Sequence, residues 1–289
     1  MGDERRTRGR PAELTAGRLS GTDLSGTELS SAELTAGLRA GYDAAADAWA
    51  DGPGPMYDRL AAALVAAAPV PLAGRLILDL GAGSGVAGRA ALAAGARRVV
   101  ATDLSEGMLR HGRAGSPVVA DAVALPFRDR SFDLVLAAFC LNHLDRPETG
   151  LAEARRVGAA IAASTFAPGW THPAKDAVDE TARSFGYRPP AWHTALAPGS
   201  RASDPEALAD LAVAAGFTGV QARVTAVPTG LAAPAELAAW RLGMAHLAPF
   251  LRSLDPPTRA AVRRAAEQAV AAVTGPAPLT VSMVVLTAS

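Results

Sequence analysis

Two stretches of this chain carry side chains that could hold a nucleotide-like molecule. The first, LILDLGAGSG at residues 76–85, is an apolar run that leads into three glycines at alternate positions. The second, RVVATD at residues 98–103, ends in Asp103, eighteen residues after Gly85. Glycines let a backbone approach a ligand where a Cβ would clash, and an acid after the next strand can bind ribose hydroxyls. The pattern predicts a site for the adenosine part of a cofactor.

The glycine spacing distinguishes between two cofactors. Dinucleotide sites carry G-x-G-x-x-G, whereas here the glycines are Gly81, Gly83 and Gly85, and the sixth position is Val86. Asp79, just before the loop, would repel a pyrophosphate and attract an ammonium group. S-adenosylmethionine carries an ammonium, a sulfonium and no phosphate. The residues therefore favour S-adenosylmethionine over NAD.

Further motifs extend this pattern along the chain. DAVALPFRDRSFDLVLAAFCLNHL at residues 121–144 follows the second run, and YDAAADAW at residues 42–49 precedes the first. Together with the glycine loop they resemble the class I S-adenosylmethionine-dependent methyltransferases, in particular the small-molecule group (type 11) that includes ubiquinone- and menaquinone-type C-methylases. The resemblance covers about residues 41–166. It implies an α/β fold with a doubly wound, seven-stranded, mostly parallel sheet in the order 3-2-1-4-5-7-6, an antiparallel last strand and a helical lid or insertion.

The resemblance also implies roles for individual residues in binding the cofactor. Asp79 and the loop amides would hold the amino-acid end, Asp103 the ribose hydroxyls and Asp121 the adenine amine. The expected cofactor-binding residues are Tyr42, Asp79, Gly81, Ala82, Gly83, Gly85, Asp103, Leu104, Met108, Asp121, Ala122 and Phe139. An Asp after a strand is alternatively a helix cap or turn former, and this alternative stays open for Asp103 and Asp121.

Histidines and aromatic residues are the candidates for chemistry on the methyl acceptor. Methyl transfer from a sulfonium is an in-line displacement that requires alignment and, for some acceptors, a base. His143 follows the fourth strand, where the resemblance places residues near the transferring methyl, and His172 and His193 are further candidates; each is alternatively a structural histidine. The expected acceptor-binding residues are Trp170, Trp192, Trp240, Met244 and His246. Packing of the lid is the alternative role for the three tryptophans.

Apolar runs and turn residues predict the elements that position these side chains. We expect strands over 76–80, 98–102, 118–120, 132–138, 159–166, 220–227 and 279–287, and the first two helices over 38–50 and 55–68. The methyltransferase domain is expected over 38–289, with acceptor-pocket segments at 167–200 and 231–274.

The start of the chain has a pattern of its own. Residues 1–37 are rich in Ser, Thr and Gly, and a leucine recurs every fifth position from Leu14 to Leu34. The favoured interpretation is a mobile, low-complexity leader. The alternative is a short segment that resembles a pentapeptide repeat, although stacked repeats need several units to bury a core.

Composition limits the classes of partner. The chain has 28 basic and 28 acidic residues, so no basic field attracts nucleic acid or an anionic membrane, and a small-molecule acceptor fits better. The single cysteine, Cys140, suits a reducing cytoplasm. It is more simply a buried apolar residue than a nucleophile. No metal-binding motif is present. We expect a cytoplasmic monomer or homodimer without a secretory signal.

These observations lead to one expected function and two alternatives. The expected function is a small-molecule methyltransferase that acts on an oxygen, nitrogen or carbon, in bacterial secondary metabolism such as antibiotic biosynthesis. The first alternative keeps the fold and the cofactor but catalyses a cyclisation or elimination without methyl transfer. The second is a nicotinamide oxidoreductase, against which Val86 and residues 121–144 argue.

Overall fold

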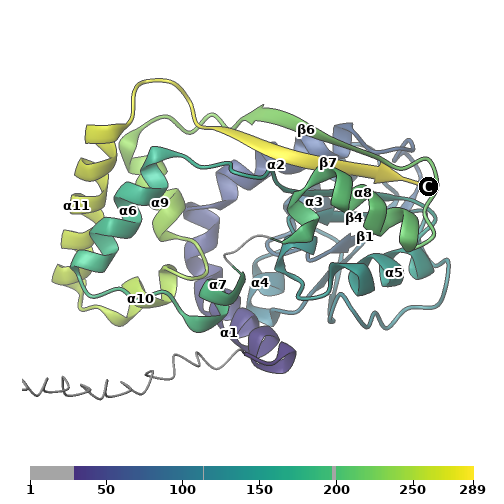
Figure 1. Cartoon of the computed structure of the whole chain (residues 1–289), viewed down its shortest axis with the longest axis horizontal. Coiled ribbons are helices and arrows are strands. Elements are labelled where there is room, and N and C mark those ends of the chain that lie inside the picture. The colour runs from purple at the N-terminus through teal and green to yellow at the C-terminus, as the bar shows by residue number, and fades with distance from the viewer. Residues whose placement is uncertain (1–28, 113, 197–199) are drawn as a thin grey trace, which may run out of the picture.

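A seven-stranded sheet forms the centre of the molecule (Figure 1). The computed structural model describes residues 29–112, 114–196 and 200–289. The strands are β1 (Leu76–Leu80), β2 (Arg98–Asp103), β3 (Ser116–Val119), β4 (Leu134–Ala138), β5 (Ile161–Phe166), β6 (Gln221–Pro228) and β7 (Thr280–Ala288). Their order is β3-β2-β1-β4-β5-β7-β6, and β7 runs antiparallel to both β5 and β6. The expected order and orientation are confirmed.

Helices cover both faces of this sheet. They are α1 (Ser31–Asp51), α2 (Gly54–Ala66), α3 (Val86–Ala93), α4 (Glu106–His111), α5 (Pro147–Val157), α6 (Pro173–Ser184), α7 (Ala191–Leu196), α8 (Pro205–Ala214), α9 (Pro234–Leu242), α10 (Ala248–Ser253) and α11 (Pro256–Val273). Short 3-10 turns lie at Leu141–His143 and Arg201–Ser203. In the part of the chain that the structure describes, none of the helices is long and apolar enough to cross a bilayer.

Successive apolar side chains along each strand pack on opposite faces of the sheet, so the core has two layers. Ile77 of β1 packs in the cluster with α2 and α3, whereas its neighbour Leu78 packs in the cluster with α5 and α8. The same alternation places Met283 and Val284 of β7 in different clusters. Side chains on successive strand positions point to opposite faces, so a sheet covered on both faces needs continuous apolar runs. These runs are the signal that predicted the strands.

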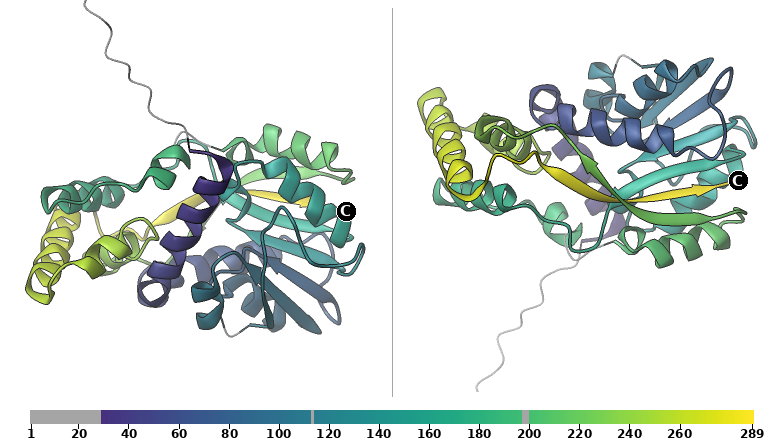
Figure 2. Two further views of the ribbon diagram at one scale, coloured as in Figure 1. Left: turned by 90° about the horizontal axis from the view of Figure 1, so that it is seen from below. Right: turned by 90° about the horizontal axis from the view of Figure 1, so that it is seen from above.

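Five helices form a cap beyond one end of the sheet (Figures 1 and 2). The cap comprises α6, α7, α9, α10 and α11, so it draws on both segments that the sequence assigned to an acceptor pocket. Arg241 of α9 donates two hydrogen bonds of 2.7 Å to the carboxylate of Asp179 of α6. Both side chains are largely buried, and this pair connects two helices that lie more than fifty residues apart in the chain.

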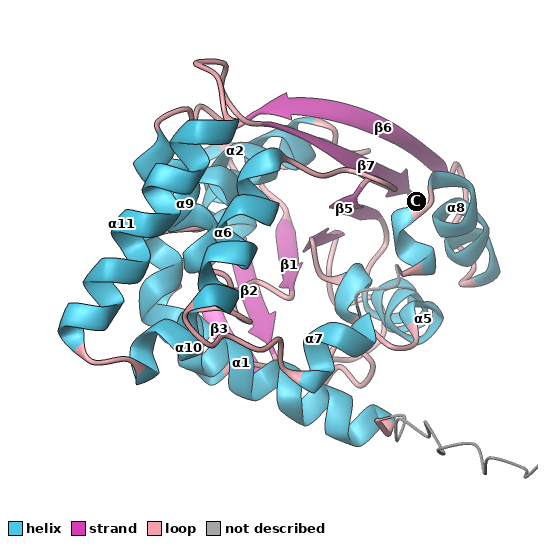
Figure 3. Cartoon of the chain, turned by 60° about the vertical axis from the view of Figure 1, so that its left-hand side comes forward, coloured by secondary structure: helices cyan, strands magenta, loops and turns pink. Residues whose placement is uncertain are grey.

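Helix α1 crosses in front of the strand ends and joins the sheet domain to the cap (Figure 3). It begins at Ser31, seven residues before the predicted start, with Ser30 and Glu33 forming a capping box. Leu34, the last of the five periodic leucines, is buried against the cap residue Trp192. Of the leader predicted over residues 1–37, residues 31–37 belong to α1, and residues 1–28 lie outside the described residues.

Candidate functional site

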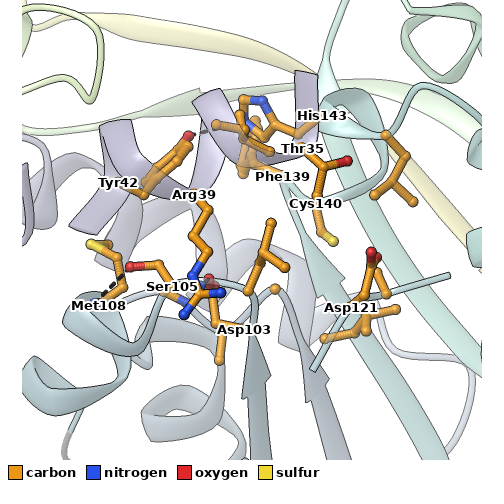
Figure 4. Close-up of a pocket in the computed structure, with 18 of the residues that line it drawn as sticks. Thr35, Arg39, Tyr42, Asp103, Ser105, Met108, Asp121, Phe139, Cys140 and His143 are labelled. Carbon is orange, nitrogen blue, oxygen red and sulfur yellow. Dashed lines mark hydrogen bonds between the residues drawn. The ribbon is translucent and has the colours of Figure 1, made fainter. Parts of the chain in front are cut away.

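A cavity of about 320 Å³ lies between α1 and the carboxyl ends of the parallel strands (Figure 4). Ten of the twelve residues predicted to bind the cofactor line it: Tyr42, Gly81, Ala82, Gly83, Asp103, Leu104, Met108, Asp121, Ala122 and Phe139. Asp79 and Gly85 do not line the cavity. In doubly wound sheets, ligands bind at this strand edge because the chain reverses its winding direction there.

The glycine loop takes a conformation that only glycine adopts readily. Gly81, Gly83 and Gly85 have φ values of 65°, 53° and 77°, in the left-handed region. A Cβ on Gly81 would lie 2.6 Å from the Sγ atom of Cys140, so the loop and the β4 end are in direct contact there. Gly85 caps the N-terminus of α3 and does not face the cavity. The loop therefore presents bare backbone toward the cavity, as the sequence predicted.

Asp103 connects the loop to the end of β2. Its carboxylate accepts hydrogen bonds of 2.8 Å from the backbone amides of Gly83 and Ser105. Burial raises the pKa of Asp103, and the two amide bonds oppose that shift. The carboxylate is thus held in a fixed position at the cavity wall. This is the position from which an acid can accept from vicinal hydroxyl groups.

Asp79 has a different position from the one predicted. It is fully buried, and one carboxylate oxygen accepts a 2.7 Å hydrogen bond from the amide of Gly88 in α3. The other oxygen, Oδ1, has no hydrogen-bond partner among the described residues. Burial raises the pKa of Asp79 to about 7. Asp79 therefore lies behind the loop, bonded to α3, and not in the cavity lining.

Asp121 combines the two roles that the sequence left open. Its Oδ1 accepts from the amide of Val123 at 3.1 Å, which is a turn-forming contact. Asp121 and Ala122 also line the cavity, across from Asp103 and Met108 (Figure 4). The two acids thus face the cavity from the ends of adjacent strands, where an adenosine group could lie between them.

The cavity wall formed by α1 was missed by the sequence analysis beyond Tyr42. Thr35, Leu38 and Arg39 line the cavity, and Arg39 extends from α1 toward the loop that carries Asp103 (Figure 4). Asp43 holds α1 in place, because its carboxylate accepts from the Ser105 hydroxyl at 2.6 Å and the Gly107 amide at 2.8 Å. The capping box of Ser30 and Glu33 is the sequence signal that marks the start of this helix.

His143 and Tyr42 form a pair at the upper edge of the cavity. The Tyr42 hydroxyl lies 3.1 Å from Nε2 of His143, and both residues line the cavity. Burial lowers the pKa of His143 to about 4 and raises the pKa of Tyr42. At neutral pH the imidazole is therefore uncharged. It has a free lone pair at Nδ1 when its Nε2–H donates to the Tyr42 hydroxyl oxygen.

Cys140 is inert by the same physical argument. The thiol is buried beneath Gly81, and burial raises its pKa. A nucleophilic cysteine needs a lowered pKa, because the thiolate is the reactive form. Cys140 therefore serves as a small packing residue between the loop and β4.

The other candidate residues belong to the cap and do not line this cavity. His172 accepts from the amide of Ala174 at 3.3 Å and so caps α6. Trp192 packs against Gly37 and Gly41 of α1, which is a role in helix packing. Trp240 is 2% exposed and lies in the core. Roles for His172, Trp192 and Trp240 in catalysis or acceptor binding stay predictions.

The four remaining candidate residues contact aromatic or apolar groups between the cavity and the cap. They are Trp170, His193, Met244 and His246. Trp170 stacks on Phe166 with ring centroids 5.0 Å apart. The ring centroid of Phe166 in turn lies 4.6 Å from that of Phe139, which lines the cavity. The rings of His193 and His246 stack at 3.9 Å. Met244 is half-buried and packs against the same core. These contacts form an aromatic connection between the cavity and the cap.

The site fits S-adenosylmethionine on three counts. The glycine backbone leaves room that a Cβ would fill, two acids face the cavity, and a carboxylate oxygen of Asp79 behind the loop has no hydrogen-bond partner among the described residues. Within residues 29–112, 114–196 and 200–289, no three His, Cys, Asp or Glu side chains gather in a group that could hold a metal ion.

Known proteins that are similar in sequence to the sheet domain are methyltransferases. Residues 78–160 match the family model described as "Methyltransferase domain". The chain is 50% identical over 97 residues to a demethylmenaquinone methyltransferase of Clavibacter sepedonicus, covering 31% of this chain and 39% of that protein. It is 34% identical over 143 residues to a demethylmenaquinone methyltransferase of Streptomyces griseus, covering 47% of this chain and 60% of that protein.

A solved structure extends the similarity of fold. It is a putative methyltransferase from an antibiotic biosynthesis pathway of Anabaena variabilis, with a TM-score of 0.53 and 18% sequence identity over 78% of this chain and 96% of that one. The sequence relatives, by contrast, are matched over about two fifths to three fifths of their length. The matched region contains the glycine loop, Asp103, Asp121 and His143, and it ends before the cap.

Proposed function

We propose that this chain, a member of the class I S-adenosylmethionine-dependent methyltransferases, transfers a methyl group to a small-molecule metabolite. The observation that carries the proposal is the cavity at the strand edge, where the glycine loop, Asp103, Asp121 and His143 meet. Each of these groups comes from the region that matches the methyltransferase family model. The acceptor enters beside them, between α1 and the cap.

The cofactor-holding groups are proposed as follows. Asp103 accepts from the ribose hydroxyls, Asp121 accepts from the adenine amine, and Met108 and Leu104 pack beside the base. The backbone of the glycine loop lies along the methionine part, and the charge of Asp79 favours the ammonium group from behind the loop. When bound, S-adenosylmethionine supplies a methyl group already activated by its sulfonium charge.

The remaining work of the protein is alignment and proton removal. Phe139, Tyr57 and Tyr42 form a rigid aromatic wall, with ring centroids 5.3 Å apart for Phe139 and Tyr57. Alignment of this kind contributes about 7–11 kcal/mol to lowering a barrier. His143, uncharged at neutral pH, accepts the proton of the acceptor, and Tyr42 holds its Nε2 side in position.

The wider setting is proposed from the same features. The acceptor is a bulky, partly aromatic or hydrophobic metabolite of bacterial secondary metabolism, such as an antibiotic precursor, methylated on oxygen, nitrogen or carbon. The protein acts in the cytoplasm as a monomer or homodimer, without nucleic acid, membrane or metal. A net charge of zero supports the absence of a polyanionic partner.

The test uses S-adenosylmethionine with a deuterated methyl group and an extract of candidate metabolites. Mass spectrometry is expected to detect a product that has gained the labelled methyl, together with S-adenosylhomocysteine. A product that forms without label and without S-adenosylhomocysteine would instead support the non-methylating cyclisation or elimination. Methyl transfer and the non-methylating reaction both need the same bound cofactor, so a cofactor-binding measurement could not distinguish them. The labelled methyl group does.

A further inference from the structure

A group of polar side chains inside the cap is not used by the reaction proposed above. We call it the cap cluster, and it consists of Lys175, Asp179, Tyr187, His193, Arg241 and His246. The members come from α6, the loop after it, α7, α9 and the turn after α9. Buried polar groups without partners are costly, so a cluster of this kind calls for an explanation.

The charges in the cap cluster do not balance. Arg241 and Asp179 form a buried, bidentate ion pair and neutralise one another. Lys175 is half-buried, and among the described residues no carboxylate lies within ion-pairing distance of its ammonium group. Its Nζ atom lies 5.2 Å from the centre of the Trp170 ring. One positive charge therefore remains, held on an aromatic face.

Two further members of the cap cluster carry unused hydrogen-bonding atoms. The Tyr187 hydroxyl and His246 Nε2 are buried and have no partner among the described residues. Tyr187 is 4% exposed and His246 is 6% exposed. The two rings are neighbours, with centroids 6.4 Å apart. The Tyr187 hydroxyl can donate, and His246 Nε2 donates in the tautomer that carries the proton on this nitrogen, so both atoms are available for an acceptor atom that the described residues do not supply.

The cap cluster lies next to the cavity that holds His143. The ring of His193 stacks on His246 with centroids 3.9 Å apart, and the adjacent Trp192 packs against Gly41 of α1, next to Tyr42 of the cavity lining. His193 adds to the effect of burial in lowering the pKa of both His143 and His246. Lys175 likewise lowers the pKa of both His193 and His246. On the other side, stacked Phe166 and Trp170 lead from Phe139 to Lys175. The ammonium group of Lys175 thus lies at one end of a row of three aromatic rings, and Phe139 at the other end lines the cavity.

We propose that the methyl acceptor is an aromatic molecule with an anionic group, in the first place a carboxylate, which binds Lys175 and the Tyr187 and His246 donors while the ring lies along Trp170 and Phe166. This inference rests on the proposed function, because it assigns the substrate class of that reaction. An anion supplies both the missing charge and the missing hydrogen-bond acceptors. A neutral, purely hydrophobic acceptor would leave all three groups unsatisfied.

The experiment compares 2-naphthoate with 2-naphthamide, which share the ring system and differ in charge. Calorimetric titration into the whole protein saturated with S-adenosylhomocysteine should show the carboxylate binding about tenfold or more tightly than the amide, since charge-assisted hydrogen bonds are the stronger ones. The preference should be lost in Lys175→Gln and kept in Lys175→Arg. Arg188→Gln, which removes an exposed charge after α6, should keep it.

A second variant separates binding from a structural role. Tyr187→Phe removes a buried hydroxyl that has no partner, so the melting temperature should stay level or rise, while the affinity for 2-naphthoate falls. A naphthoate affinity that does not exceed the amide affinity, including the absence of binding by either, overturns the inference. So does a preference that survives Lys175→Gln. These titrations need no turnover, so a failure of methyl transfer would count against the proposed function alone.

Discussion

At the scale of single residues, Asp103 is the side chain on which cofactor binding depends most. Its carboxylate accepts two backbone hydrogen bonds within the protein, so it is held rigidly toward the cavity. Hydrogen bonds to a charged group contribute about 1.5–3 kcal/mol each. We predict that Asp103→Ala weakens S-adenosylhomocysteine binding by about 10–100-fold or more in calorimetry. Asp133→Ala, at a half-exposed acid beside β1 outside the cavity, serves as the control.

Substitution of His143 should change the turnover rate and leave the affinity for the cofactor unchanged. It lies at the edge of the cavity and its neutral form prevails at neutral pH. A positioned base accelerates a reaction by about 10²–10⁴-fold, so we predict that His143→Ala lowers kcat within this range and leaves cofactor affinity unchanged. Tyr42→Phe should have a smaller effect, because only the hydrogen bond to Nε2 is removed. Unchanged turnover in His143→Ala would exclude this residue as the base.

Asp79 makes stability depend on pH. Its pKa is raised to about 7 by burial, while the unfolded chain releases the same proton near the ordinary value of about 4. The folded protein therefore holds a proton that the unfolded chain has lost, and the free energy of unfolding falls as pH rises through this interval. We predict a loss of about 1 kcal/mol per pH unit from Asp79, measured by urea unfolding between about pH 5 and pH 7. Burial raises the pKa of Asp103 as well, which acts in the same direction.

The control for this pH dependence is Asp79→Asn, which keeps the shape of the side chain and removes its titration. The variant should show a shallower decline than the parent protein over the same interval. Equal slopes for the two proteins would mean that Asp79 is already ionised when folded. Only the slope is compared, because the amide itself changes the absolute stability.

At the scale of elements, α1 is the part that completes the cavity. Two contacts fix it: Asp43 on the N-terminus of α4, and Gly37 and Gly41 against the indole of Trp192 on α7. Helix α1 therefore contacts both the sheet domain and the cap. The tight glycine contacts explain why this helix carries two glycines despite their cost to helix formation.

Gly41→Ala tests this packing. Alanine favours a helix over glycine by about 0.5–1 kcal/mol, but its Cβ would lie 2.8 Å from Cζ2 of Trp192. Overpacking costs about 1–3 kcal/mol, so we predict a net loss of stability, with a lower melting temperature and weaker cofactor binding. In a Trp192→Leu background the same change should become neutral or stabilising. A stabilising effect in the parent protein would contradict the packing argument.

At the scale of the whole molecule, the cap and one face of the sheet share a continuous buried cluster, and α1 contacts both the cap and the sheet domain. The buried ion pair between Arg241 and Asp179 holds α6 against α9 within the cap. Removing one partner of a buried pair leaves an unpaired charge and costs about 3–5 kcal/mol. We predict that Asp179→Asn opens the cap locally, with faster hydrogen exchange in α6 and α9 and unchanged protection in β1 and β4.

The double variant Asp179→Leu with Arg241→Met is the matched control for this prediction. It removes both charges and keeps apolar volume, so protection of α6 and α9 should return toward that of the parent protein. Uniform loss of protection across the sheet in Asp179→Asn would instead mean that the cap and the sheet unfold as one unit.

The predictability of the site differs from residue to residue for physical reasons. Asp103 and the glycines follow from local pattern, because the loop conformation and the strand end are set by neighbouring residues. Asp79 was assigned to the ligand because sequence position does not reveal which way a strand residue faces. For Trp192 the sequence left acceptor binding and lid packing both open, since composition alone cannot distinguish an aromatic that lines a pocket from one that packs on a helix, and the structure shows its contact with α1.

The sequence by itself determined where the strands lie, the glycine loop and the acids at the strand ends, because apolar runs and glycine conformation are local properties. The order and direction of the strands came from the resemblance to the class I methyltransferases. Only the tertiary structure decided that α1 closes the cavity, that His143 meets Tyr42, and that Lys175 is left without an anionic partner inside the cap. Those features join residues far apart in the chain, and their burial and charge balance exist only once the elements have packed together.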